Sequence, residues 1–191
     1  MTKDLLHTAE IKDVVRDAYR SVAGETTAVA CRFYSDTELA RVPTGAVDGA
    51  LGVANHLRHA QLEPGLVVLD VGCGAGIDSI LAAQRVGPAG RVLALDFLPE
   101  MLERTAAAAR EAALDNVETV EGEMEAVPLP DASVDVVISN GVLNLSPRKA
   151  RALAELRRVL RPGGELCVAD LTVDERDLPP EVLTHPAAWA G

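Results

Sequence analysis

The stretch LDVGCGAGIDSILAA, residues 69–83, decides how this chain of 191 residues folds. A short apolar run leads into three glycines at alternate positions, Gly72, Gly74 and Gly76, and an apolar helical pattern follows them. Glycine permits the positive φ angles of a tight turn and lets a ligand approach the backbone closely. The N–H groups at the start of the following helix attract anionic or polar ligands. The stretch therefore predicts a strand, a ligand-binding turn and a helix.

Two acidic residues accompany this turn. Asp96 closes the next apolar run, 20 residues after Gly76, where a carboxylate suits hydrogen bonds from ribose hydroxyls. The nicotinamide dinucleotide fingerprint G-x-G-x-x-G has its third glycine one residue later than Gly76. Asp70, two residues before Gly72, would repel a pyrophosphate, whereas it can hold the ammonium end of a methionine tail. We therefore expect S-adenosylmethionine rather than a dinucleotide; alternatively, Asp70 caps amides of the turn itself.

Short apolar runs alternate with helical stretches on both sides of the turn. The expected strands are 66–71, 91–96, 117–122, 134–139 and 164–170, and the expected helices are near 77–86, 99–113 and 147–160. Each helix is long enough for a right-handed crossover between parallel strands. The predicted fold class is therefore α/β, with a Rossmann-like, doubly wound and mainly parallel sheet of five strands.

The remaining segments flank this core. Residues 11–23 carry apolar side chains at helical spacing, which predicts an amphipathic helix. Residues 24–56 lack a clear periodicity, and we interpret them as a lid-like segment with short helical pieces. We divide the chain into this N-terminal helix and lid-like segment (1–60), a cofactor-binding core (61–172), and a C-terminal extension (173–191) that we interpret as truncated.

Charge and composition exclude several classes of protein. The chain has 18 basic and 29 acidic residues, a formal charge of −11, so its average field repels phosphate backbones and anionic membranes. No signal peptide or membrane-length apolar run is visible. The three scattered cysteines offer neither a disulfide framework nor a zinc motif. We expect a cytoplasmic protein that binds neither nucleic acid nor membrane.

The motifs resemble a known family when they are taken in order. DVGCGAG, VPLPDASVDVVISN and LRPGGELCVAD are similar to the motifs of class I S-adenosylmethionine-dependent methyltransferases. Outside this core, the stretches IKDVVRDAYRSVA, YSDTELARVPTGA, SNGVLNLSPRKARALAELRRVLRPGG and HPAAWAG resemble the arsenite methyltransferase family. The resemblance implies the class I fold, S-adenosylmethionine as cofactor and methyl transfer as the activity.

The resemblance also implies contacts for most of the cofactor. Adenine would be flanked by Phe97 and Leu98, with Glu123 and Met124 at its edge, and Asp96 would hold the ribose diol. Phe97 and Met124 could instead be core residues. The contacts expected for the methionine portion lie in the glycine turn: Asp70, Gly72, Cys73, Gly74 and Gly76.

At the reacting end of the cofactor, the resemblance implies two further contacts, but this chain lacks the cysteines of the arsenite methyltransferase family. Asn140 would lie under the sulfonium, and Tyr19 would close over the cofactor or simply pack its own helix. Trivalent arsenic prefers thiolate ligands. The family's cysteines are absent here: 51–56 reads LGVANH, Gly141 stands at the second position, and the chain ends at Gly191, where the third would follow. We therefore expect an acceptor other than arsenite.

The sequence leaves the acceptor and the catalytic group unassigned. His56 and His59 fit a solvated helical face better than a catalytic pair. We expect a methyltransferase that acts on a small molecule; the alternatives are an inactive methyltransferase-like binding protein and, less favoured, a nicotinamide-dependent oxidoreductase. The resemblance implies two more strands after the fifth, and the 21 residues after Asp170 lack their pattern. Because 164–170 reads as buried on both faces, we expect a homodimer or a partner subunit to cover that edge.

Overall fold

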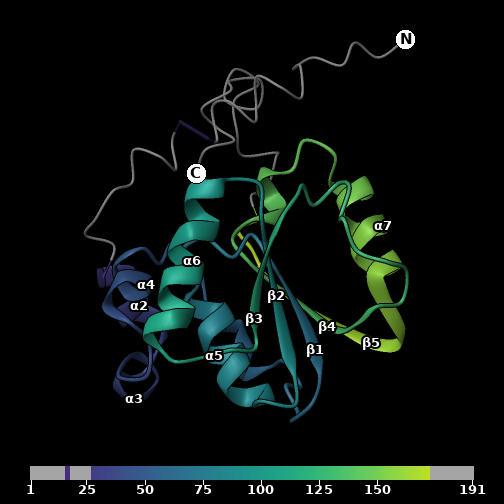
Figure 1. Ribbon diagram of the computed structural model, residues 1–191. Helices are drawn as coiled ribbons and strands as arrows, with labels where there is room; N and C mark the ends of the chain where they lie inside the picture. Colours follow the sequence, from purple (N-terminus) through teal and green to yellow (C-terminus); the bar gives the residue numbers. More distant parts are fainter. Residues whose placement is uncertain (1–15, 18–26, 173–191) are drawn as a thin grey trace.

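The computed structural model describes residues 16–17 and 27–172, and its centre is a five-stranded sheet, which Figure 1 shows between the helices. All four strand pairs are parallel, and the strand order is β3-β2-β1-β4-β5. The strands are β1 (Val67–Val71), β2 (Arg91–Asp96), β3 (Val117–Glu121), β4 (Val134–Asn140) and β5 (Leu160–Ala169). The predicted parallel α/β sheet of five strands is therefore confirmed.

Three helices connect the strands close to the predicted positions. They are α5 (Ile77–Val86), α6 (Pro99–Glu111) and α7 (Lys149–Val159). Gly76 precedes α5 with φ +95° and Gly87 follows it with φ +66°, so glycine sets both ends of this helix. Helix α6 has proline at its first position, where the missing N–H has no partner to lose. The glycines and the proline in the sequence therefore indicate where these two helices begin and where α5 ends.

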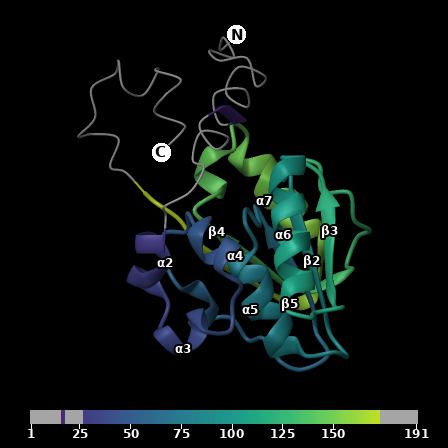
Figure 2. The same cartoon turned by 60° about the vertical axis from the view of Figure 1, so that its left-hand side comes forward.

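The helices cover both faces of the sheet, as doubly wound folds require. On one face, Val68 and Val136 pack with Ile80 of α5 in a core that also includes residues of α6. On the other face, Leu69 and neighbouring strand residues pack with Leu156 of α7. Adjacent residues of β1 therefore face opposite helical layers, which explains why every residue of this strand except Asp70 is apolar. Figure 2 shows α5 and α6 together on one side of the sheet.

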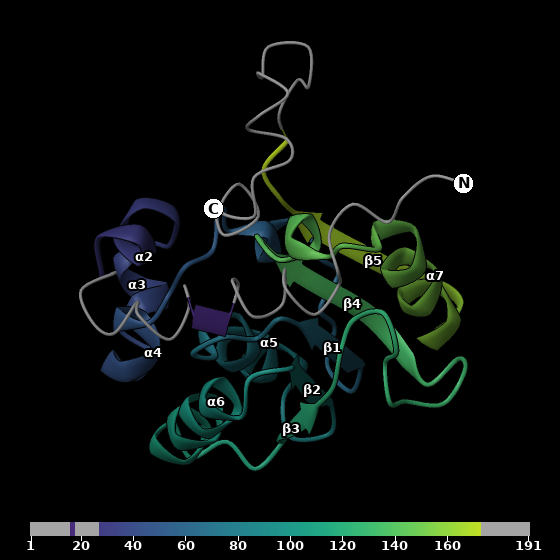
Figure 3. The same cartoon turned by 90° about the horizontal axis from the view of Figure 1, so that it is seen from above.

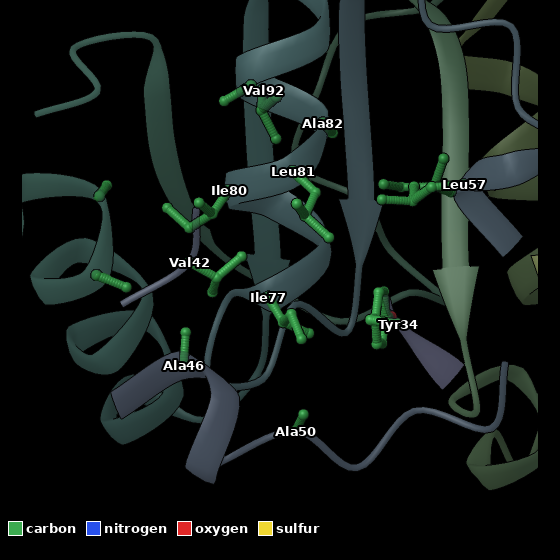
Figure 4. Close-up of a cluster of buried hydrophobic side chains, with 14 of the residues drawn as sticks. Tyr34, Val42, Ala46, Ala50, Leu57, Ile77, Ile80, Leu81, Ala82 and Val92 are labelled. Carbon is green, nitrogen blue, oxygen red and sulfur yellow. The ribbon is translucent and has the colours of Figure 1, made fainter. Parts of the chain in front are cut away.

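The N-terminal part of the described chain consists of short helices, as predicted for the lid-like segment. These are α2 (Thr27–Phe33), α3 (Asp36–Leu39), α4 (Thr44–Asp48) and the 3₁₀ helix η1 (His56–Arg58). Val42 and Ala46 pack against Ile77 and Ile80 of α5 (Figure 4). The predicted helix over 11–23 lies outside the described residues except for 16–17, which are helical. The division into three regions remains a prediction.

Strand β5 departs from the prediction in two ways. It begins at Leu160, which pairs with Val134 before a β-bulge shifts the register. The expectation that β5 is buried on both faces is wrong, because Leu166 and Val168 are 41% and 37% exposed. Within residues 27–172, β5 is an outer strand of the sheet, so its side chains are flanked by a neighbouring strand on one side only. Leu166, Val168 and the exposed Leu171 form what we call the β5 patch.

Candidate cofactor site

A pocket opens at the carboxyl ends of β1, β2 and β4. The strand order reverses between β1 and β4, and ligands of open α/β sheets bind at such a reversal. The walls come from the turn after β1, the ends of β2 and β4, and residues 49–52 of the N-terminal segment. Seen from above, helices α2 to α4 lie on one side of the sheet and α7 on the other (Figure 3). The empty space in the pocket is about 870 Å³, a volume that includes open solvent at its mouth.

The glycine turn forms one wall of this pocket. Gly72, Gly74 and Gly76 have φ angles of +74°, +53° and +95°, which side chains rarely adopt. A Cβ on Gly76 would lie 2.9 Å from Thr105 Oγ1, and one on Gly72 would lie 2.5 Å from Val142. No atom outside the turn's immediate neighbours lies within 4 Å of a Cβ placed on Gly74. Two of the glycines therefore permit close packing, and the middle one leaves backbone open to a ligand.

Asp96 lies at the end of β2 and holds the turn in place. Its Oδ2 accepts the Gly74 N–H at 3.1 Å and its Oδ1 accepts the Leu98 N–H at 3.0 Å. Burial raises the pKa of this carboxyl group, against the opposing effect of the backbone N–H donors. A carboxylate has about four acceptor sites, so both oxygens retain capacity for ribose hydroxyls. The predicted role of Asp96 is compatible with this geometry.

Asp70 is 2% exposed, and its Oδ2 accepts the Ser79 hydroxyl at 2.6 Å. The Gly74 N–H of the turn is accepted by Asp96 rather than by Asp70. Burial, reinforced by the nearby charge of Asp78, raises the pKa of Asp70 to about 8. A cationic ligand beside Asp70 would favour the ionised carboxylate and lower this raised pKa.

Asp78 was not predicted from the sequence, although it lies inside the quoted stretch two residues after Gly76. It lines the pocket with Asp70 and Asp96, and each of the three is at most 8% exposed. None of the described lining residues is basic. The pocket therefore favours a cation such as a sulfonium or ammonium group over a pyrophosphate. The three carboxyl groups fit the sulfonium and ammonium groups of S-adenosylmethionine.

The structure brings most of the other expected contacts to the pocket wall. Cys73, Phe97, Leu98 and Met124 all line it. Burial raises the pKa of the Cys73 thiol, which suits a packing role. The guanidinium carbon of Arg16 lies 6.0 Å from the ring centre of Phe97.

Three residues that we expected to contact the cofactor are not shown by the structure in that role. Glu123 is exposed and is not among the described residues of the wall. Tyr19 lies outside the described residues, so its role remains a prediction. Asn140 lines the pocket, but its amide hydrogen-bonds within the protein: Oδ1 accepts the Val53 N–H at 2.9 Å and Nδ2 donates to the Ala54 carbonyl at 2.8 Å. These contacts join residues 86 or more apart in sequence, which periodicity could not reveal.

The described cysteines do not converge. Cys31 is exposed on α2, Cys73 is buried in the turn, and Cys167 on β5 donates its thiol to the His56 carbonyl at 3.4 Å. Within the ranges 16–17 and 27–172, no cluster of three His, Cys, Asp or Glu side chains could hold a metal ion. No helix in the described part is long and apolar enough to cross a membrane.

Known proteins share this sequence and fold. The methyltransferase domain family matches residues 62–190. An arsenite methyltransferase of Halobacterium salinarum is 42% identical over 158 residues, 83% of this chain and 40% of that protein. A demethylmenaquinone methyltransferase of Listeria welshimeri is 41% identical over 111 residues, 58% of this chain and 47% of that protein. The chain thus spans less than half the length of these two relatives.

Two solved structures agree with these matches. An arsenic(III) S-adenosylmethionine methyltransferase from Chlamydomonas reinhardtii shares 41% identity and a TM-score of 0.71, covering 80% of this chain and 53% of that one. A methyltransferase from Aquifex aeolicus, described as S-adenosylmethionine-dependent, shares 34% identity and a TM-score of 0.58, with coverage of 65% and 66%. The family match, the glycine turn and the acidic pocket agree: the chain belongs to the methyltransferase domain family, as a class I S-adenosylmethionine-dependent member that resembles the arsenite methyltransferases.

Proposed function

We propose that this chain transfers the methyl group of S-adenosylmethionine to a small-molecule acceptor. The observation that carries the proposal is the juxtaposition of the glycine turn with Asp70, Asp78 and Asp96 in one buried pocket. A bound S-adenosylmethionine would supply an electrophilic methyl group on a positively charged sulfur. Carboxylates in a buried pocket favour that charge more strongly than water-exposed ones would.

The residues around the pocket support binding and orientation rather than proton transfer. Asp96 would hold the ribose and Asp70 the ammonium group. Leu51, Val142 and Leu145 form apolar parts of the wall and would exclude water from the acceptor. No histidine or lysine occurs among the described residues of the wall. Alignment of the acceptor with the methyl group supplies much of the rate enhancement in such a site, so a dedicated base is not required.

The acceptor is proposed to differ from arsenite. The described thiols lie apart, whereas a soft metalloid is best held by several sulfur ligands together. The matched relatives are themselves named for different acceptors, arsenite and demethylmenaquinone. Resemblance alone therefore leaves the acceptor open, and the apolar wall favours a small molecule with an apolar body.

A product assay tests this proposal. The purified chain is incubated with S-adenosylmethionine and a panel of oxygen, nitrogen, sulfur and carbon nucleophiles, with trivalent arsenic included, and released S-adenosylhomocysteine is measured. We expect acceptor-dependent release that Asp96→Ala reduces and Asp115→Ala, an exposed control, leaves unchanged. Release from no member of the panel would contradict the proposed activity and favour the inactive, methyltransferase-like alternative.

We also infer that a second copy of this chain covers the open side of β5. Within residues 27–172, the outer edge of β5 pairs with no strand, and the β5 patch lies beside it. Exposed strand edges pair readily, and two identical edges are self-complementary about a two-fold axis. Light scattering after gel filtration should give about twice the chain mass of 20.1 kDa, and Leu166→Lys should shift it to the monomer. A stable wild-type monomer would contradict this inference.

A further inference from the structure

A buried polar cluster joins the N-terminal segment to the pocket. Tyr34, directly after α2, donates its hydroxyl hydrogen to Asp78 Oδ1 at 2.6 Å. Asn140, at the end of β4, donates from Nδ2 to Asp78 Oδ2 at 3.0 Å and lies 3.3 Å from the Tyr34 hydroxyl. Asp78 and Asn140 line the pocket, whereas Tyr34 is not among the described residues of its wall. Three distant parts of the chain thus meet at one carboxylate.

The same cluster holds the segment 49–54, which we call the roof. The Asn140 side-chain amide accepts the N–H groups of Val53 and Ala54 at 2.9 and 3.3 Å and donates to the Ala54 carbonyl at 2.8 Å. The two N–H bonds of its amide therefore face acceptors on Ala54, Asp78 and Tyr34. Little hydrogen-bonding capacity remains for a ligand. Asn140 is thus placed to fix the roof rather than to bind the cofactor directly.

Two glycines allow the roof to lie this close. A Cβ on Gly52 would lie 2.3 Å from Asn140 Nδ2, and a Cβ on Gly49 would lie 2.5 Å from the Cβ of Ala75 in the glycine turn. Real Cβ atoms do not approach neighbours so closely, so substitution would push the roof away. By contrast, a Cβ on Gly45 meets nothing within 4 Å. The roof therefore contacts both the turn and Asn140 through backbone that lacks side chains.

Hydrogen bonds within this cluster occupy both carboxyl oxygens of Asp78. The imidazole of His56 lies beside it, with Nδ1 4.0 Å from Asp78 Oδ2. Burial lowers the pKa of His56, against the raising effect of Asp78, and neither ring nitrogen has a hydrogen-bond partner in the described part of the chain. A neutral imidazole offers no compensating charge. Tyr34 and Asn140 are therefore the groups that keep the buried carboxylate satisfied.

We propose that Tyr34, Asp78 and Asn140 form a latch that holds the roof closed over the pocket, with Tyr34 and Asn140 as positioning residues for the cofactor site. The proposal rests on the proposed cofactor-binding function. Opening the roof requires the loss of several buried hydrogen bonds at once. The latch would consequently slow ligand dissociation without Tyr34 touching the ligand.

Dissociation of S-adenosylhomocysteine from the immobilised full chain tests the latch. We expect Tyr34→Phe and Asn140→Ala each to accelerate dissociation by about 5- to 100-fold, as the loss of a buried hydrogen bond implies. Gly52→Ala should do the same in the wild-type background. In an Asn140→Ala background, Gly52→Ala should add little, because the atoms that its methyl group would strike are gone.

Two controls separate the latch from general destabilisation. Gly45→Ala should leave dissociation unchanged. Val159 is fully buried on the opposite face of the sheet. Val159→Ala should therefore lower the midpoint of thermal unfolding but leave the dissociation rate of S-adenosylhomocysteine unchanged. If Tyr34→Phe leaves dissociation unchanged, or if Val159→Ala accelerates it equally, the proposal is overturned.

Hydrogen exchange distinguishes failure of the latch from failure of the proposed function. In the free wild-type chain, the Val53 amide should exchange slowly, and Tyr34→Phe and Asn140→Ala should accelerate its exchange. If the wild type does not bind S-adenosylhomocysteine, the proposed function fails, and this exchange measurement alone then decides the latch. Equal Val53 exchange rates in the wild type and the variants would overturn it.

Discussion

The raised pKa of Asp70 predicts that cofactor binding releases a proton. In the free chain this carboxyl group has a pKa of about 8, because it is buried beside Asp78. It is therefore about 1% ionised at pH 6 and about half ionised at pH 8. Only the ionised form pairs with the ammonium group, so the affinity for S-adenosylhomocysteine should increase about 50-fold from pH 6 to pH 8. The sign follows from the direction of the shift: binding lowers a raised pKa, so affinity rises with pH.

Isothermal titration calorimetry measures both consequences. Titrations at pH 6, 7 and 8 give the affinity, and titrations in two buffers of different ionisation enthalpy give the protons released. Asp70→Asn keeps the shape of the side chain and cannot ionise, so its affinity should vary little over this range. If the wild-type affinity changes less than about twofold, or if Asp70→Asn retains the wild-type pH dependence, the assigned role of Asp70 is wrong.

Three further predictions concern stability. Gly76→Ala should reduce the free energy of unfolding, measured in urea, by about 2–5 kcal/mol, because backbone strain adds to the collision with Thr105. Gly65 also has a positive φ but lies in open space, so Gly65→Ala should reduce it by only about 1–2 kcal/mol. Leu57→Ala should lose about 2–5 kcal/mol in the same assay, since Leu57 is fully buried, and a loss below 1 kcal/mol would contradict its place in the core. The pKa of Asp70 is 3.8 in the unfolded chain and about 8 in the free folded chain. Its contribution to the free energy of unfolding is therefore fully present below pH 3.8 and is lost as the pH rises through about 8. The stability of wild type relative to Asp70→Asn should therefore fall by up to about 1.4 kcal/mol per pH unit between pH 5 and 8; a constant difference would refute this.

The sheet and its connecting helices were predictable because their signals are local. Parallel strands buried on both faces are nearly continuous apolar runs, as in β1 and β4, and glycine marks both ends of α5. The same logic failed for β5, which resembles a central strand in composition. Among the described strands β5 lies at the edge of the sheet, a position that its own composition does not reveal, and Leu166 is 41% exposed there.

The pocket was predictable from the sequence where it is built from backbone turns and carboxylates. The glycine turn, Asp70 and Asp96 follow from residue type and spacing. The sequence suggested a lid-like segment over 24–56, but the hydrogen bonds that hold the roof could not be predicted, because they depend on contacts such as Tyr34 with Asp78, 44 residues apart. A tyrosine, an aspartate and an asparagine at those distances carry no periodic signal, and only the fold brings them together.

The central claim is that the acidic pocket binds S-adenosylmethionine through its adenosine and methionine groups. Isothermal titration of the full chain with S-adenosylhomocysteine at pH 8 tests it most directly, with Asp96→Ala and the exposed control Asp115→Ala in parallel. We predict saturable binding that Asp96→Ala weakens by about 1–3 kcal/mol and Asp115→Ala leaves unchanged. The absence of both heat and a thermal shift at millimolar ligand, or equal affinity in Asp96→Ala, would contradict the claim.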